Sequence, residues 1–402
     1  MSGTGRAVAP RLLARQRQPG EVVQFQVADI AFQYFDLDDA EASRGPTLSR
    51  NSMTYCAGWK YGGSVYLLAD SAATGSAPPS TAHSNFGELH TEIRGEYVEE
   101  ALLKIVPLAD GIAVAFAGDV SLATKIIDFL MENLQFYGNS LAALLAAATT
   151  SLAPFPPDRQ VELLLAASSA DGGSQLLHWD TVHGLDGGIS DYYQIGSMVS
   201  YHKQLTPEVL SWLARGNPPA DRFLAIAIAV VQSYGIHSNL MEQNIGGLVF
   251  GVRTQAGISA WQEDTTFVLY DAGLANPTWV SAFARDDAIV TNSSQTNEVR
   301  VLMHSASTPS AQAWTAKWNT YVKTHLESNR YRYWVFLSTQ GQVITLIRRK
   351  NLDLESKYVR IIKTGENKFD MALSQELVSV LRTPLVDRRD GGLPFRFNVL
   401  ND

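Results

Sequence analysis

The sequence predicts a layered α+β protein with antiparallel sheets. Short apolar strands occur in pairs joined by tight turns, and these pairs alternate along the chain with pairs of helices. This order differs from the strand–helix alternation of a parallel nucleotide-binding sheet, and neither a GxGxxG nor a P-loop motif is present. Residues 281–402 carry 17 Lys and Arg against 12 Asp and Glu, whereas residues 1–280 carry 15 against 28. The change in charge predicts a boundary near residue 280.

Composition excludes several classes of protein. The 402 residues, 46% hydrophobic and 18% charged, predict a globular protein of about two domains. No apolar run approaches the roughly 18 residues of a membrane span, and no aromatic-basic motif indicates a nucleic-acid partner. The single cysteine, Cys56, excludes an intramolecular disulfide and favours a reducing, cytoplasmic compartment. The histidines lack metal-ligand spacing, so we expect no metal and no cofactor.

Residues 1–53 are expected to be an N-terminal extension. The segment 22–36 is apolar enough for a strand, and a polar loop rich in helix breakers follows it. Three interpretations remain open, namely a propeptide, a docking arm, or an upstream segment absent from the mature protein.

Regular patterning begins at Thr54 and defines the expected domain 54–280. A hairpin is predicted across Gly62-Gly63, and a loop rich in Ser, Ala, Gly and Pro is predicted over 71–87. Apolar runs bounded by turn residues predict the strands 55–61, 64–69, 102–108, 112–117, 161–167, 175–181, 192–195, 246–253 and 258–262.

Four helices are predicted between these strands. Apolar residues at helical spacing indicate 120–136, an alanine-rich segment indicates 140–152, and Thr206-Pro207 marks the start of 208–214. The fourth helix, 221–234, is apolar almost all round, which predicts that it is covered on both sides.

Residues 281–402 are predicted to form a smaller α+β domain, with docking or regulation as its expected role. We expect helices over 311–326 and 374–381, and a strand pair over 331–338 and 342–349.

Four residues of the first domain have the chemistry of an N-terminal nucleophile. A threonine hydroxyl needs a base, and a free α-amino group on the same residue can supply one. A nearby lysine favours the neutral amine, an aspartate holds the lysine, and a glycine N–H stabilises the oxyanion. The sequence offers Thr54, Asp70 after the apolar run VYLLA, Lys104 between Leu103 and Ile105 within an expected strand, and Gly118 after IAVAFA.

The stretch TYCAGWKYGGSVYLLADSAATG resembles the start of a mature proteasome β subunit. The stretch KIVPLADGIAVAFAG resembles that family's lysine and oxyanion-hole strands, and the likeness covers about residues 54–270. The opening TYC is most similar to the bacterial proteasome-like group called Anbu.

The resemblance implies a four-layer αββα sandwich, assembly into a homo-oligomeric ring, and threonine peptidase activity. Thr54 would be nucleophile and base, Asp70 and Lys104 its supporting pair, and Gly118 an oxyanion donor. Ser197, in QIGS, resembles the family's later active-site serine. Substrates would be peptides or unfolded proteins, and any unfolding ATPase would be a separate chain.

Several positions depart from the family pattern. Glu242 and Ile245 stand where the family keeps an aspartate and a serine. Met53, not glycine, precedes Thr54, which suggests removal of an initiator methionine. The family's arginine near the aspartate is missing, and the loop between Asp70 and Lys104 is unusually long.

Cys56 lies two residues from Thr54, and a small core residue is the favoured interpretation over a second nucleophile. The main alternative to a peptidase is a catalytically silent subunit used for assembly or partner binding. A small-molecule amidase on the same scaffold is a third hypothesis.

Overall fold

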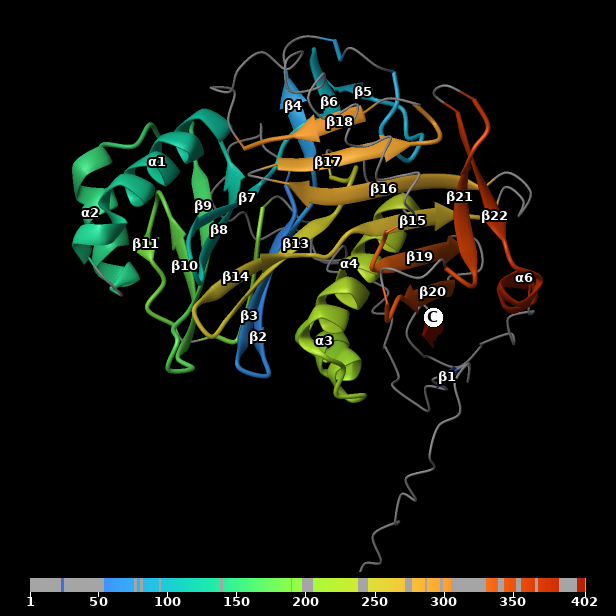
Figure 1. The fold of residues 1–402 in the computed structure, drawn as a ribbon. Helices are drawn as coiled ribbons and strands as arrows, with labels where there is room; N and C mark the ends of the chain where they lie inside the picture. Colours follow the sequence, from blue (N-terminus) through green and yellow to red (C-terminus); the bar gives the residue numbers. More distant parts are fainter. Residues whose placement is uncertain are drawn as a thin grey trace, which may run out of the picture.

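The structure is a computed structural model in which strands predominate over helices. It describes residues 23–24, 54–75, 78–79, 82–93, 95–137, 140–188, 190–196, 205–237, 245–271, 277–285, 288–296, 299–304, 330–338, 343–351, 356–365, 368–382 and 396–401. These residues form a mixed α+β protein, as the strand pairs and helix pairs of the sequence predict (Figure 1).

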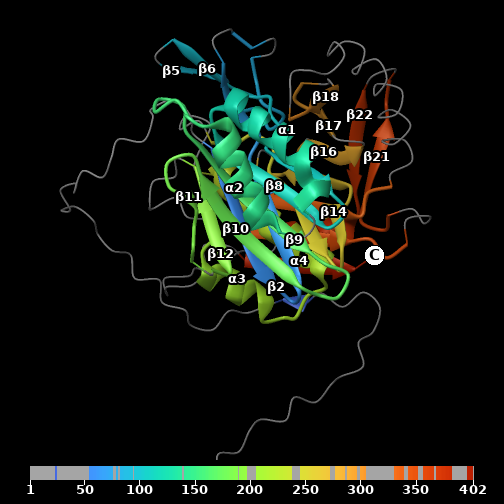
Figure 2. The ribbon, with the colours of Figure 1, turned by 90° about the vertical axis from the view of Figure 1, so that its left-hand side faces the viewer.

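One five-stranded sheet carries two helices on its outer face. Its order is β11-β10-β9-β8-β7, and every pairing is antiparallel. The strands are β7 (Ile105–Ala109), β8 (Ile112–Gly118), β9 (Val161–Ser168), β10 (Ser174–Asp180) and β11 (Gly184–Leu185). The helices α1 (Val120–Tyr137) and α2 (Leu141–Leu152) bury Ile126 and Leu144 against Leu163 of β9. Figure 2 shows both helices lying over β8, β9 and β10.

A second five-stranded sheet packs against the inner face of the first. Its order is β12-β2-β3-β13-β14, and its pairings are also antiparallel. The strands are β2 (Cys56–Tyr61), β3 (Ser64–Ala69), β12 (Tyr192–Ile195), β13 (Phe250–Gln255) and β14 (Ile258–Trp261). A Cβ atom on Gly58 would lie 2.9 Å from Leu176 Cδ1, so the Leu176 side chain of the first sheet fills the space that a side chain on β2 would need. The predicted hairpin across Gly62-Gly63 is confirmed.

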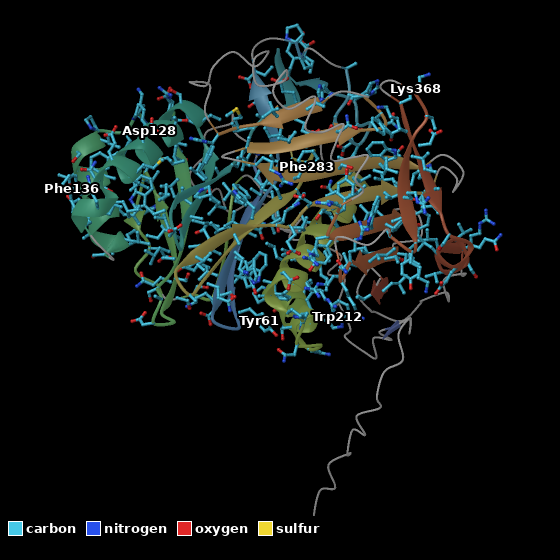
Figure 3. All side chains as sticks on the ribbon, viewed as in Figure 1. Tyr61, Asp128, Phe136, Trp212, Phe283 and Lys368 are labelled. Carbon is cyan, nitrogen blue, oxygen red and sulfur yellow. The ribbon has the colours of Figure 1, made fainter. Side chains whose placement is uncertain are left out.

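Helices α3 (Pro207–Ala214) and α4 (Ala220–His237) lie on the other face of this second sheet. Tyr61 at the end of β2 donates from its hydroxyl to the carbonyl of Ala214, 3.3 Å away, and Figure 3 shows Tyr61 and Trp212 at this end of the molecule. Helix α4 contacts β3 and β13 on one side and β19 and β20 on the other. The prediction that this helix is covered on both sides is therefore confirmed.

The largest sheet has eight strands in the order β1-β23-β20-β19-β15-β16-β17-β18. The strands are β1 (Val23–Gln24), β15 (Thr265–Leu269), β16 (Thr278–Arg285), β17 (Ala288–Ser293), β18 (Val299–Leu302), β19 (Tyr333–Ser338), β20 (Val343–Arg348) and β23 (Arg396–Asn401). Pairings β15–β19 and β20–β23 are parallel, and the others are antiparallel.

The expected boundary at residue 280 falls inside β16, and β15 lies before it. The C-terminal part is thus larger than expected, because residues from Thr265 onward contribute to this sheet. The hairpin β21 (Val359–Lys363) and β22 (Phe369–Leu373), with α6 (Gln375–Arg382), covers its far face. The predicted helix 311–326 lies outside the described residues.

The segment between Asp70 and Lys104 contains a small sheet that the sequence did not predict. Its order is β4-β6-β5, with β4 (Ala72–Gly75), β5 (Thr91–Ile93) and β6 (Glu96–Glu100). The expected loop 71–87 therefore begins with a strand. Glu100, the last residue of β6, lies 3.7 Å from Arg300 of β18, so this end of the small sheet is near the eight-stranded sheet.

Candidate active site

Asp70 and Lys104 form a buried ion pair between the two five-stranded sheets. Asp70 directly follows β3, and Lys104 directly precedes β7. Lys104 Nζ lies 2.6 Å from Asp70 Oδ1, and the two side chains are 2% and 1% exposed. Two charges this deeply buried are tolerated only as partners. The structure thus brings together the two residues predicted to support the nucleophile, while their catalytic role stays a prediction.

Lys104 lies just before β7, where the sequence predicted a position inside the strand. Its backbone carbonyl still accepts from the Phe116 amide at 3.0 Å, so it remains against β8. The two preceding residues turn away from β8, because the Leu103 amide donates to the Met303 carbonyl at 3.1 Å. The strand is shortened by this competing partner.

Backbone amides fix the orientation of the Asp70 carboxylate. Oδ1 accepts from the Tyr55 amide at 3.0 Å, and Oδ2 accepts from the Gly246 amide at 2.9 Å. The Asp70 amide in turn donates to the Tyr55 carbonyl at 3.1 Å. With the lysine, three donors from three separate segments therefore hold one carboxylate, which leaves it little freedom to rotate.

Thr54 is adjacent in the chain to Tyr55, whose amide binds this carboxylate. It is 4% exposed, and its backbone lies against Gly196 at the end of β12. A Cβ atom on Gly196, whose φ is +100°, would lie 1.8 Å from the Thr54 carbonyl oxygen. Only glycine fits between these backbones. The predicted nucleophile is therefore placed beside the Lys104–Asp70 pair, and its chemistry stays a prediction.

Gly118 is the last residue of β8, and it lies at the end of the first sheet where Lys104 precedes β7. Its φ is +108°, and a Cβ atom there would lie 2.1 Å from the Gln160 carbonyl oxygen. Phe116 of β8 donates its amide to the Lys104 carbonyl, and Gly118 is two residues further along the same strand. A glycine is required here for packing, and its role as an oxyanion donor stays a prediction.

Cys56 is a buried thiol with no features of a nucleophile. Its Sγ donates to the Phe116 carbonyl at 3.3 Å, and the side chain is fully buried. Burial raises the pKa of the Cys56 thiol far above its usual range, although the positive charge of Lys104 opposes this effect. The thiol is therefore protonated at neutral pH, and the interpretation as a small core residue is confirmed.

Three residues of the predicted set, Ser197, Glu242 and Met53, lie outside the described residues. Ile245 is described, and its side chain is 5% exposed and packs in the core. It precedes Gly246, whose amide binds Asp70. The place where the resemblance implies a serine hydroxyl thus carries a buried apolar group.

Sequence reasoning missed two carboxylates near the site. Glu162 of β9 accepts from the Gly196 amide at 2.8 Å, and Glu100 of β6 accepts from the Leu248 amide at 2.9 Å. Burial raises the pKa of Glu162. A lone acid inside the apolar run VELLLAA was a signal for Glu162. Glu100 had no such signal, because it follows a second glutamate in a polar stretch.

A surface pocket of about 310 Å³ lies away from these residues. It is lined by Pro107 to Asp110 at the far end of β7 and by residues of β13 and β14. Its walls hold none of the predicted site residues, so we do not assign it to the site.

The described part of the chain brings no three His, Cys, Asp or Glu side chains close enough to hold a metal ion. No helix among these residues has both the length and the apolar composition that a membrane crossing requires.

Comparison with known proteins gives no match, either to a model of a protein family or to a curated protein. The resemblance to proteasome β subunits stays a prediction from the sequence.

Proposed function

We propose that this protein is a threonine-type amide hydrolase of the N-terminal-nucleophile class, acting on peptides. The buried Lys104–Asp70 pair carries the proposal, because the same carboxylate also binds the amide that follows Thr54. The layer order supports it as well, since α1 and α2, two antiparallel sheets and α3 and α4 succeed one another as an αββα sandwich requires.

The proposed reaction starts from a Thr54 whose α-amino group is free. That amine has an ordinary pKa of about 8, and the Lys104 charge favours its neutral, basic form. The amine takes the Thr54 hydroxyl proton as the oxygen attacks the scissile carbonyl, and it then passes this proton to the leaving amine. An N–H at Gly118 stabilises the oxyanion. Water, deprotonated by the same amine, then releases the acyl group.

Removal of residues 1–53 is a condition of this mechanism. An amide nitrogen at Thr54 has no basic lone pair, so the unprocessed chain lacks the proposed base. Met53 precedes a residue with a small side chain, which suits removal of an initiator methionine.

The test compares a chain started at Met53 with the full-length chain. Intact mass spectrometry reports whether each begins at Thr54, and fluorogenic peptides and non-peptide amides report hydrolysis. We expect hydrolysis only from protein beginning at Thr54, retention of part of it in Thr54→Ser, and none in Thr54→Ala. Unchanged hydrolysis in Thr54→Ala would rule out the proposed nucleophile. Hydrolysis of non-peptide amides alone would make the protein an amidase.

A catalytically silent subunit is the second candidate, and Ile245 favours it. Its buried apolar side chain cannot hydrogen-bond a terminal amine. A purified protein that keeps residues 1–53 and hydrolyses no substrate would support this candidate.

The proposal includes a homo-oligomeric ring in the cytoplasm, supplied with unfolded chains by a separate ATPase. Exposed apolar side chains on α1 support an interface between subunits, since Phe136 is 73% exposed and Met131 is 45% exposed. Figure 3 shows Phe136 at the outer end of that helix. Light scattering after size-exclusion chromatography measures the mass of the assembly. A monomer at working concentration would argue against the ring.

A further inference from the structure

The eight-stranded sheet reaches the candidate site through its edge strand β18. The Leu103 amide, one residue before Lys104, donates to the Met303 carbonyl at 3.1 Å just beyond the end of β18. Leu102 forms a parallel bridge with the same residue. The backbone that presents Lys104 is therefore held by the C-terminal part of the chain.

A second connection runs from β18 through Glu100. The Glu100 side chain is fully buried, and Arg300 of β18 lies 3.7 Å from its Oε2. Its Oε1 accepts from the Leu248 amide at 2.9 Å, and its Oε2 accepts from the Asn85 amide at 2.7 Å. A buried carboxylate with these partners fixes the backbone segments that it binds.

The segment that Glu100 binds is the one that orients Asp70. Gly246 donates to Asp70 Oδ2, and its carbonyl accepts from the Ser71 amide at 3.2 Å. Gly247 has a φ of +67°, and a Cβ atom there would lie 2.6 Å from Ser71 Oγ and 2.9 Å from Glu100 Cγ. The turn is thus packed tightly between Glu100 and the residue after Asp70.

The long segment between Asp70 and Lys104 is fastened to the same sheet. Arg300 donates to the His83 carbonyl at 2.6 Å, and the Asn85 side chain donates to Thr291 Oγ1 at 3.0 Å. The Ser293 hydroxyl donates to the Asn85 carbonyl. This segment therefore joins β17 and β18 to Glu100.

We propose that Glu100 and Arg300 are positioning residues, through which the eight-stranded sheet sets the Asp70 carboxylate for the reaction at Thr54. The inference rests on the proposed function for its catalytic part. Its structural part, the hold on the Leu248 amide, is independent of any activity. Arg300 balances the charge of the buried Glu100, so removing the guanidinium loosens the turn at Gly246 without touching substrate.

The test compares Arg300→Met with a matched control in the same sheet, Arg285→Met. Arg285 pairs with Asp264 at 2.6 Å in a partly buried ion pair, and its guanidinium also contacts the Ala284 carbonyl and the Phe283 ring. We expect kcat to fall about tenfold or more in Arg300→Met with KM within twofold of the parent, because a small misplacement of a supporting group slows the chemical step. Arg285→Met should keep kcat, and Arg300→Lys should recover most of it.

Amide hydrogen exchange of Leu248 supplies the second measurement. We expect it to be at least about tenfold faster in Arg300→Met and in Glu100→Gln than in Arg285→Met, compared at equal global stability. Exchange no faster than in the control would overturn the proposal, whatever the kinetics. Faster exchange with unchanged kcat in an active protein would overturn the positioning role. Loss of hydrolysis in every chain, including the parent, would count against the proposed function alone, and the exchange rates would still decide the hold on Leu248.

Discussion

The fold tolerates the buried charges of Lys104 and Asp70 only while both are present. Lys104→Met leaves an uncompensated carboxylate, so we expect a loss of about 3–5 kcal/mol in the free energy of unfolding. The pair Lys60–Asp191, also 2.6 Å apart, is the control, because its aspartate side chain is 78% exposed and the lysine is 22% exposed. Lys60→Met should cost about 1 kcal/mol or less. Equal losses in urea denaturation of the two variants would contradict the buried pairing.

Gly196 separates two backbones that a single methyl group would force apart. In Gly196→Ala the new Cβ atom meets the Thr54 carbonyl at a positive φ, so we expect a loss of more than about 3 kcal/mol. Gly62 also has a positive φ, of +59°, but a Cβ atom there meets nothing within 4 Å. Gly62→Ala should therefore cost only about 1 kcal/mol. Thermal denaturation of both variants checks the difference, and similar melting temperatures would be inconsistent with the close contact.

Glu88 makes stability depend on pH near neutrality. Burial raises the pKa of Glu88 from 4.5 to about 8, the Ser84 hydroxyl and Gly247 amide oppose this shift, and Glu100 adds to it. Between these two values the folded protein keeps a proton that the unfolded chain has lost, so stability falls as pH rises toward 8. The slope from this group is at most about 1.4 kcal/mol per pH unit.

Urea unfolding of the parent and of Glu88→Gln at pH 5, 6.5 and 8 measures this effect. Glutamine does not titrate. As pH rises from 5 to 8, the unfolding free energy of the parent should therefore fall relative to that of Glu88→Gln. A constant difference across the three pH values would argue against the raised pKa.

At the scale of elements, α4 is the helix that joins the second sheet to the eight-stranded sheet. Its Asp221 accepts from the Tyr333 hydroxyl at 2.6 Å and from Arg348 at 2.9 Å. Tyr333→Phe should therefore cost about 1.5 kcal/mol, the contribution of a hydrogen bond to a charged group. Tyr61→Phe removes a longer bond, 3.3 Å, to a neutral carbonyl and should cost less. The reverse order in chemical denaturation would contradict the role of Asp221 as the anchor.

The sequence predicted well those elements in which the spacing of apolar residues matches the face that the element buries. The hairpin β2–β3, the helices α1 and α2 and the doubly covered α4 belong to this group. Strand β13 begins at Phe250 and not at the expected residue 246, because the amides of Gly246 and Leu248 bind carboxylates from other segments. Strands β15 to β18 went unpredicted although β15–β16, β16–β17 and β17–β18 are pairings of consecutive strands, and only β15 also pairs with the distant β19.

At the scale of the whole molecule, one hydrophobic core crosses the expected boundary near residue 280. It contains Phe223 and Leu224 of α4 together with Phe267, Val280 and Tyr333 of the eight-stranded sheet. We therefore expect a single cooperative transition in differential scanning calorimetry of the full chain. Two separated transitions would instead support two independently folding domains.

The sequence indicated candidate site residues but not the contacts that hold them. Thr54 was singled out because regular patterning begins there, Asp70 and Gly118 because they follow apolar runs, and Lys104 because it lies within one. Glu100, Arg300 and Met303 were not found, because nothing local distinguishes them from solvated residues. Their importance arises from contacts across roughly 150 to 200 residues of sequence, such as those of Glu100 with Leu248 and Arg300.

The sequence alone therefore determined the mixed α+β class, the order of strands and helices between residues 54 and 262 apart from β4, β5, β6 and β11, and the residues that could carry chemistry. Periodicity and composition encode these features locally, since each depends on a residue's own neighbours. Only the tertiary structure decided that Lys104 and Asp70 meet, that α4 joins two sheets, that Met303 binds the residue before Lys104, and that Arg300 of β18 lies against Glu100. These contacts depend on burial and hydrogen bonding between distant segments, which no local pattern records.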